Sequence, residues 1–137
     1  MGDVIEMQKL SAIKGQTSRL LIYCRAIQGL KTFPLDQTLA EQLIQVRPKR
    51  RSMRLETYFN KLLAEFPDDC AIQDFDVMFN PDYQVDVLKI LIEARKHKRF
   101  QVIWPGKYEN GKLTYSLETY PDYKVYDIED YDVTCIV

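Results

Sequence analysis

Hydrophobic positions recur at helical spacing in two stretches of the sequence. In the first stretch these positions are Leu55, Tyr58, Phe59, Leu62, Leu63 and Phe66. Pro67 stops the run, so we predict a helix from Met53 to Phe66. In the second stretch they are Val85, Leu88, Leu91 and Ile92. That spacing predicts a helix from about Asp82 to Lys98. The cations near its end support this prediction, because they suit the negative C-terminal end of a helix dipole.

Short apolar runs lie on both sides of the second helix. Residues Cys70 to Phe75 precede it and residues Phe100 to Trp104 follow it. A helix between two short apolar strands is typical of a parallel βαβ unit with a right-handed crossover. Asn110-Gly111, a strong hairpin signal, then predicts an antiparallel excursion. The pattern therefore predicts an α/β domain with a mainly parallel sheet and an added β-hairpin near residues 107–115.

The region from Ser18 to Ile27 is compatible with two structures. Leu20, Cys24 and Ile27 share one face of a helix, which Gly29 would cap. The run from Leu20 to Tyr23 equally fits a buried strand. The residues by themselves leave helix and strand open here.

Composition limits the class of protein. With 137 residues, 46% of them hydrophobic, the chain suits one globular domain spanning residues 1–137. The net charge of -1 creates no overall field toward nucleic acid or membranes. Cys24, Cys70 and Cys135 lack a Cys-x-x-Cys spacing, which argues against a disulfide scaffold or a zinc site. No membrane-span or signal-peptide pattern is present, and we expect a cytoplasmic protein.

A block of cations is the clearest local charge feature. Five fall within residues 47–54, namely Arg47, Lys49, Arg50, Arg51 and Arg54. Such a block could contact DNA phosphates or an acidic partner. It lacks interleaved aromatic residues, and a solvated loop and helix start is the interpretation we favour. A second cluster, Arg95 to Arg99, fits a helix C-terminus, although an arginine there could reach a neighbouring subunit of a homo-oligomer. His97 has no partner that would suggest a catalytic base, so we predict no catalytic residue and no metal site.

The order of residues from Phe79 to Asp127 is specific. Its features are Phe79, Pro81, Leu88, Leu91, Arg99, Val102, Trp104, Gly106, Gly111, Leu113, Thr114, Tyr115, Pro121, Tyr123 and Tyr126. This stretch resembles the C-terminal half of the BrxF family, the small P-loop proteins of type 3 BREX systems, which defend bacteria against phage. The resemblance implies a small three-layer P-loop NTPase-like domain. It also implies protein partners, the larger ATPase, methyltransferase and phosphatase-like subunits of such a system, and it favours a helix over residues 18–27.

The resemblance also implies a phosphate-binding loop ahead of that helix. Counting back from Phe33-Pro34 places the loop at residues 10–17. There Leu10 replaces the first glycine and Gln16 replaces the lysine that would reach the β and γ phosphates. The degenerate nucleotide site would consist of Lys14, Gly15, Gln16, Thr17 and Ser18. Without the lysine, ATP with Mg²⁺ should bind weakly if at all, and efficient hydrolysis is not expected.

The loop and the Walker B-like position each have a second possible assignment. A competing placement of the loop, residues 25–32, keeps Lys31-Thr32 but loses both glycines and leaves no room for a helix before Phe33. Asp74 and Asp76 occupy a Walker B-like position, or are solvated residues that end a strand. We therefore expect a degenerate ATPase-like subunit that binds partner proteins. The alternatives are an active ATPase using Lys14, Gly15 and Thr17, and a DNA-binding accessory subunit using the block from Arg47 to Arg54.

Overall fold

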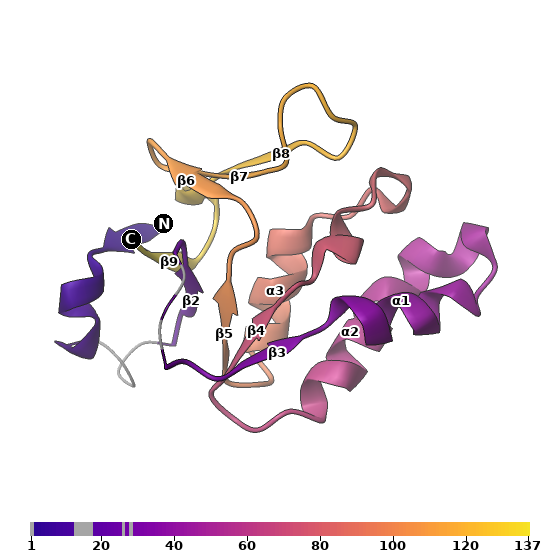
Figure 1. The fold of residues 1–137 in the computed structure, drawn as a ribbon, viewed down its shortest axis with the longest axis horizontal. Helices are drawn as coiled ribbons and strands as arrows, with labels where there is room; N and C mark the ends of the chain where they lie inside the picture. Colours follow the sequence, from indigo (N-terminus) through magenta and orange to yellow (C-terminus); the bar gives the residue numbers. More distant parts are fainter. Residues whose placement is uncertain (1, 13–17, 26, 28) are drawn as a thin grey trace.

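A six-stranded parallel sheet forms the centre of the protein (Figure 1). The computed structural model describes residues 2–12, 18–25, 27 and 29–137. The strands of this sheet are β1 (Asp3–Ile5), β2 (Leu20–Tyr23), β3 (Thr32–Pro34), β4 (Cys70–Gln73), β5 (Phe100–Ile103) and β9 (Val133–Ile136). They lie in the order β1-β9-β2-β5-β4-β3, and each of the five pairings is parallel. The predicted α/β class with a mainly parallel sheet is confirmed, as is the parallel pairing of β4 with β5.

Among the described residues, three α-helices and several 3-10 turns connect the strands. The α-helices are α1 (Asp36–Ile44), α2 (Arg51–Ala64) and α3 (Val87–Arg95), and the 3-10 turns are η1 (Met7–Ala12), η2 (Pro48–Arg50), η3 (Asp76–Phe79), η4 (Pro81–Tyr83) and η5 (Ile128–Asp130). Both predicted helices are present. The second is shorter than predicted, because the Asp86 carboxylate accepts a hydrogen bond from the Lys89 N–H and so caps α3. No helix in the described part of the chain is long and apolar enough to cross a membrane.

The helices cover one face of the sheet. Ile22, Ile72 and Val102, on consecutive strands of the sheet, are fully buried in one core with side chains of α1, α2 and α3. On the other face Leu21, Tyr23 and Ile136 pack against η1 and the segment after β2. The connection from β2 runs toward one edge of the sheet, and the connections that follow β3 and β4 run back in the opposite direction. Right-handed crossovers place connections of opposite direction on opposite faces of the sheet, as is found here.

The predicted helix over residues 18–27 is wrong. Leu20–Tyr23 form β2, all four side chains are buried, and the strand pairs with β5 on one side and β9 on the other. A continuous apolar run is what a strand covered on both faces requires, and here that tertiary environment decides between two local patterns. After β2 the chain reaches β3 at Thr32.

A small antiparallel sheet follows β5. It consists of β6 (Lys107–Glu109), β7 (Lys112–Tyr115) and β8 (Lys124–Asp127). Asn110 and Gly111 have φ angles of 50° and 79°, as a two-residue type I′ turn requires, so the predicted hairpin is confirmed. Figure 1 shows this sheet beyond the C-terminal end of β5.

Candidate anion-binding groove

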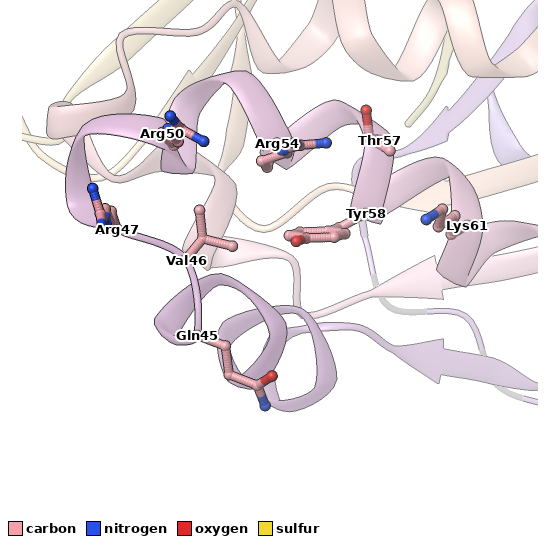
Figure 2. A pocket seen from close by; sticks show the side chains of 8 residues that line it. All are labelled: Gln45, Val46, Arg47, Arg50, Arg54, Thr57, Tyr58 and Lys61. Atoms are coloured by element: carbon pink, nitrogen blue, oxygen red, sulfur yellow. The ribbon is translucent and has the colours of Figure 1, made fainter.

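An open groove of about 560 Å³ lies where α1 gives way to α2 (Figure 2). Its lining residues are Gln45, Val46, Arg47, Arg50, Arg54, Thr57, Tyr58 and Lys61. Four of the eight are cations and none is an acid. We call this site the basic groove. The helices that carry it, α1 and α2, lie at the β3 end of the sheet, away from β9 (Figure 1).

The turn between the helices is fixed by Arg51. Its Nε donates a hydrogen bond of 3.0 Å to the carbonyl of Val46, and its Nη2 donates one of 3.4 Å to the carbonyl of Ile44. The second bond satisfies a carbonyl that the end of α1 leaves without a partner in the helix, and the first satisfies a carbonyl of the turn that follows. Pro48 starts η2, which suits the fixed φ angle of proline. Arg51 therefore stabilises the turn beside the groove and does not face a ligand.

One stripe of α2 supplies most of the lining. Arg50, Arg54, Thr57 and Lys61 are separated by four, three and four residues, which places them on the same side of a helix. At 1.5 Å per residue the stripe is about 16 Å long. The Tyr58 ring lies in the middle of the lining in Figure 2, and it is half-buried because it also packs against the main core.

The cations of the groove have no ion-pair partner among the described residues, and no acid lines the groove. Within the described part of the chain, none of Arg47, Arg50, Arg54 and Lys61 forms an ion pair, whereas Lys98 and Arg99 pair with Asp68 and Asp69. The first turn of α2 also lacks an acidic residue. Cations beside a helix N-terminus oppose the helix dipole, each at a cost of about 0.3–1 kcal/mol. This arrangement disfavours the isolated fold slightly and favours a bound anion.

The structure divides the predicted basic block. Arg47, Arg50 and Arg54 come together in the groove, Lys49 is exposed outside its lining, and Arg51 is bonded to carbonyls. Lys61 and Tyr58 also line the groove, but they lie beyond the block and were not among the predicted residues. The signal was available, because Lys61 follows Arg50 by eleven residues, which is three helical turns.

The predicted nucleotide loop falls mostly outside the described residues. Lys14, Gly15, Gln16 and Thr17 are not described, and Ser18 is exposed just before β2. The neighbouring elements are η1 on one side and β2 on the other. A Walker A loop follows a strand and opens a helix, so these neighbours differ from those of the motif. Nucleotide binding by this loop stays a prediction.

The competing placement at residues 25–32 does follow a strand, but its lysine lies at the wrong end of the sheet. Lys31 and Thr32 lie at the start of β3, whereas ligands of parallel α/β sheets bind beyond the carboxyl ends of the strands. The Lys31 Nζ lies 5.5 Å from the centre of the Phe33 ring, where a cation–π contact is favourable. The contact with Phe33 therefore accounts for this lysine without a bound phosphate.

Acidic side chains gather at the carboxyl ends of β3 and β4. Asp74 and Asp76, the Walker B-like residues, are exposed there, and Asp76 accepts a 2.9 Å hydrogen bond from the Tyr115 hydroxyl. Burial raises the pKa of Asp36, with smaller contributions from the charges of Asp76 and Asp74, although the Val77 N–H donates to its carboxylate and acts in the opposite direction. No group of three His, Cys, Asp or Glu side chains in the described ranges could hold a metal ion.

Packed aromatic side chains cover the adjoining end of β5. The Trp104 indole N–H donates a 2.9 Å hydrogen bond to the carbonyl of Thr114, and its ring meets Phe79 edge to face. Phe79 in turn stacks on Tyr115 with ring centres 3.8 Å apart. Gly106 passes so close to β7 that a Cβ atom would lie 1.8 Å from the Thr114 oxygen. This end of β5 is thus joined to the small sheet by tight packing.

The comparisons with known proteins found no match. No family model, no curated protein and no solved structure is similar to this chain. The fold and the groove define an α/β protein with a basic groove on its helical side.

Proposed function

We propose that this chain is a non-hydrolysing, P-loop NTPase-like subunit of a BREX-type bacterial defence system, and that it acts by binding partner proteins. The resemblance of residues Phe79 to Asp127 to the BrxF family supports the assignment to such a system. The parallel sheet with β2 at its centre supports the likeness to a P-loop domain. We base the absence of ATP turnover on Gln16, which stands where the loop of residues 10–17 would need its lysine, and the short connection from β2 to β3 argues against the competing placement of the loop.

That connection has room for a loop but not for a loop followed by a helix. Residues 24–31 join Tyr23 to Thr32. A Walker A loop alone takes about eight residues, and a helix must follow it to present its N-terminal N–H groups to the phosphates. The chain must also cross from β2 to β3, past β5 and β4, a distance of about 14 Å at ordinary strand spacing. The competing placement at residues 25–32 is therefore too short for the loop and the following helix of a working site.

Partner binding has support in the loop between β7 and β8. Leu117 and Tyr120 are 53% and 56% exposed there. Large apolar side chains that are exposed together commonly mark protein interfaces, and tyrosine is among the residues that contribute most to binding energy. We propose this loop as the surface that partner subunits contact.

Thermal unfolding with Mg-ATP tests the first part of the proposal. Ligand binding stabilises a protein by RT ln(1 + [L]/Kd), so a Kd of about 1 mM or weaker gives at most about 0.4 kcal/mol at 1 mM ligand. We expect a shift of about 1 °C or less and no phosphate release. A shift of several degrees would show a functional nucleotide site, and steady phosphate release would show an active ATPase instead.

A defence assay tests the second part. A BREX gene cluster that includes the gene for this chain should restrict phage plating. The double substitution Leu117→Ser and Tyr120→Ser should reduce that restriction. It should also reduce the amount of partner subunits recovered with the tagged chain. The matched control is Lys112→Ser with Lys124→Ser on the neighbouring strands. Unchanged restriction and recovery in the loop variant would refute the proposed interface.

A further inference from the structure

We infer that the basic groove binds single-stranded nucleic acid, with phosphates on its four cations and a base on the Tyr58 ring. This inference is independent of the proposed nucleotide and defence roles, because it uses none of the residues that carry them. It rests on the length of the cation stripe, on the absence of Asp and Glu from the residues that line the groove, and on the aromatic ring within the lining.

The length of the groove points to a polymer rather than to a single phosphate group. Arg50 is the N-cap residue of α2 and Lys61 lies on that helix eleven residues later, so they are separated by about 16 Å along the axis. One phosphate can contact neighbouring cations but cannot reach both ends of this stripe. A nucleic-acid strand in stacked geometry places a phosphate about every 3.4 Å, or about four or five over this length. Arg54 lies between the two ends, and Arg47 extends the row onto the turn.

The aromatic ring favours a single strand over a duplex. Tyr58 is half-buried, because the ring packs on the core while also lining the groove. A base can stack on such a ring only if it is free of its pairing partner, and grooves that combine cations with stacking surfaces are typical of single-strand binding. The Thr57 hydroxyl and the Gln45 amide add hydrogen-bonding groups without sequence preference. An acidic peptide would use the cations but would gain little from the ring.

Fluorescence anisotropy with a labelled twelve-residue oligothymidylate tests the inference. We expect micromolar binding at 50 mM salt, and a log–log salt slope of about -2 to -3, because each neutralised phosphate of a single strand contributes about -0.7. Arg50→Ala with Arg54→Ala should weaken binding at least tenfold and flatten the slope by about 1.4. The matched control is Lys49→Ala with Lys89→Ala, which removes the same charge from exposed positions outside the groove. That control should keep its affinity within about twofold.

Substitutions at Tyr58 test the stacking role. Tyr58→Phe keeps the ring and should bind as the unaltered chain does, whereas Tyr58→Leu should lose about tenfold, within the range measured for single base stacks. Because Tyr58 also contacts the core, circular dichroism and urea unfolding of each variant confirm that it is folded. The readout is binding by the folded variant.

Three results would overturn the inference. The first is no binding at 50 mM salt, or equal loss in the groove variant and its control. The second is equal affinity for a twelve-base-pair duplex together with unchanged binding by Tyr58→Leu, which would mean that a duplex backbone is the ligand. The third is competition by polyglutamate as strong as by oligothymidylate at equal charge, which would mean that the groove binds an acidic protein.

Discussion

Two adjacent arginines of the basic block should respond to substitution in different ways. Arg51 donates hydrogen bonds of 3.0 and 3.4 Å to carbonyls at the end of α1. Hydrogen bonds from charged groups contribute about 1.5–3 kcal/mol when well formed. The longer bond is weak and both lie near solvent, so we expect Arg51→Ala to cost about 1–2 kcal/mol. Arg50 is exposed, and its side chain has no hydrogen-bond or ion-pair partner among the described residues, although its backbone N–H donates to the Arg47 carbonyl. Its removal from the N-terminus of α2 should therefore leave the free energy of unfolding unchanged or raise it by up to about 0.5 kcal/mol.

Urea unfolding followed by circular dichroism measures this difference. Arg and Ala have similar helix propensities, so the local helical cost is small and nearly equal in the two variants. The free energies come from linear extrapolation with a shared m value. For a domain of this size the cost at Arg51 corresponds to a lower Tm by roughly 3–6 °C. Equal effects of the two substitutions, or no effect at Arg51, would refute the division of the block into a structural and a ligand-binding arginine.

Two further substitutions test the packing and the charge distribution. Gly106→Ala should lower the free energy of unfolding by about 3 kcal/mol or more, since its Cβ atom would lie 1.8 Å from the Thr114 oxygen and would disrupt the hydrogen bond that this oxygen accepts. Urea unfolding measures the loss, and an unfolding midpoint equal to that of the wild type would contradict it. Asp36→Asn concerns a carboxyl whose folded pKa lies above its ordinary value of 3.8. Such a group disfavours folding once pH rises through that range, so the variant should gain stability relative to the wild type between about pH 3 and pH 7. Unfolding at both pH values measures the gain. A variant that instead loses stability relative to the wild type toward pH 7 would show that the helix dipole affects the Asp36 carboxyl more strongly than burial and the neighbouring carboxylates do.

The parts of the fold with strong local signals were predictable. The spacing of Leu55, Phe59 and Leu62 matches a buried helix stripe, and Asn110-Gly111 supplies two residues that accept positive φ angles. The run from Leu20 to Tyr23 was not resolved by such reasoning. Its choice of strand depends on β5 and β9, which lie about 80 and 110 residues further along the chain.

The candidate site was only partly predictable for a similar reason. A block of cations is visible in the sequence, but its charge count does not distinguish Arg50, which lines the groove, from Arg51, which bonds to carbonyls. That distinction depends on the path of the turn between α1 and α2. Lys61 could have been found from helical spacing, whereas the contribution of Tyr58 required knowing which side of its ring the core covers.

The position of β9 has a consequence for how the chain folds during synthesis. Val133–Ile136 lie between β1 and β2, so that residues from the two ends of the sequence pair directly. Until these residues leave the ribosome, β2 has only one of its two neighbours and β1 has none. An unpaired strand edge can pair with other chains, and contacts so distant in sequence form slowly. The nascent protein therefore carries an open apolar edge until β9 has been synthesised, and we expect its yield in cells to depend on chaperones that cover such edges.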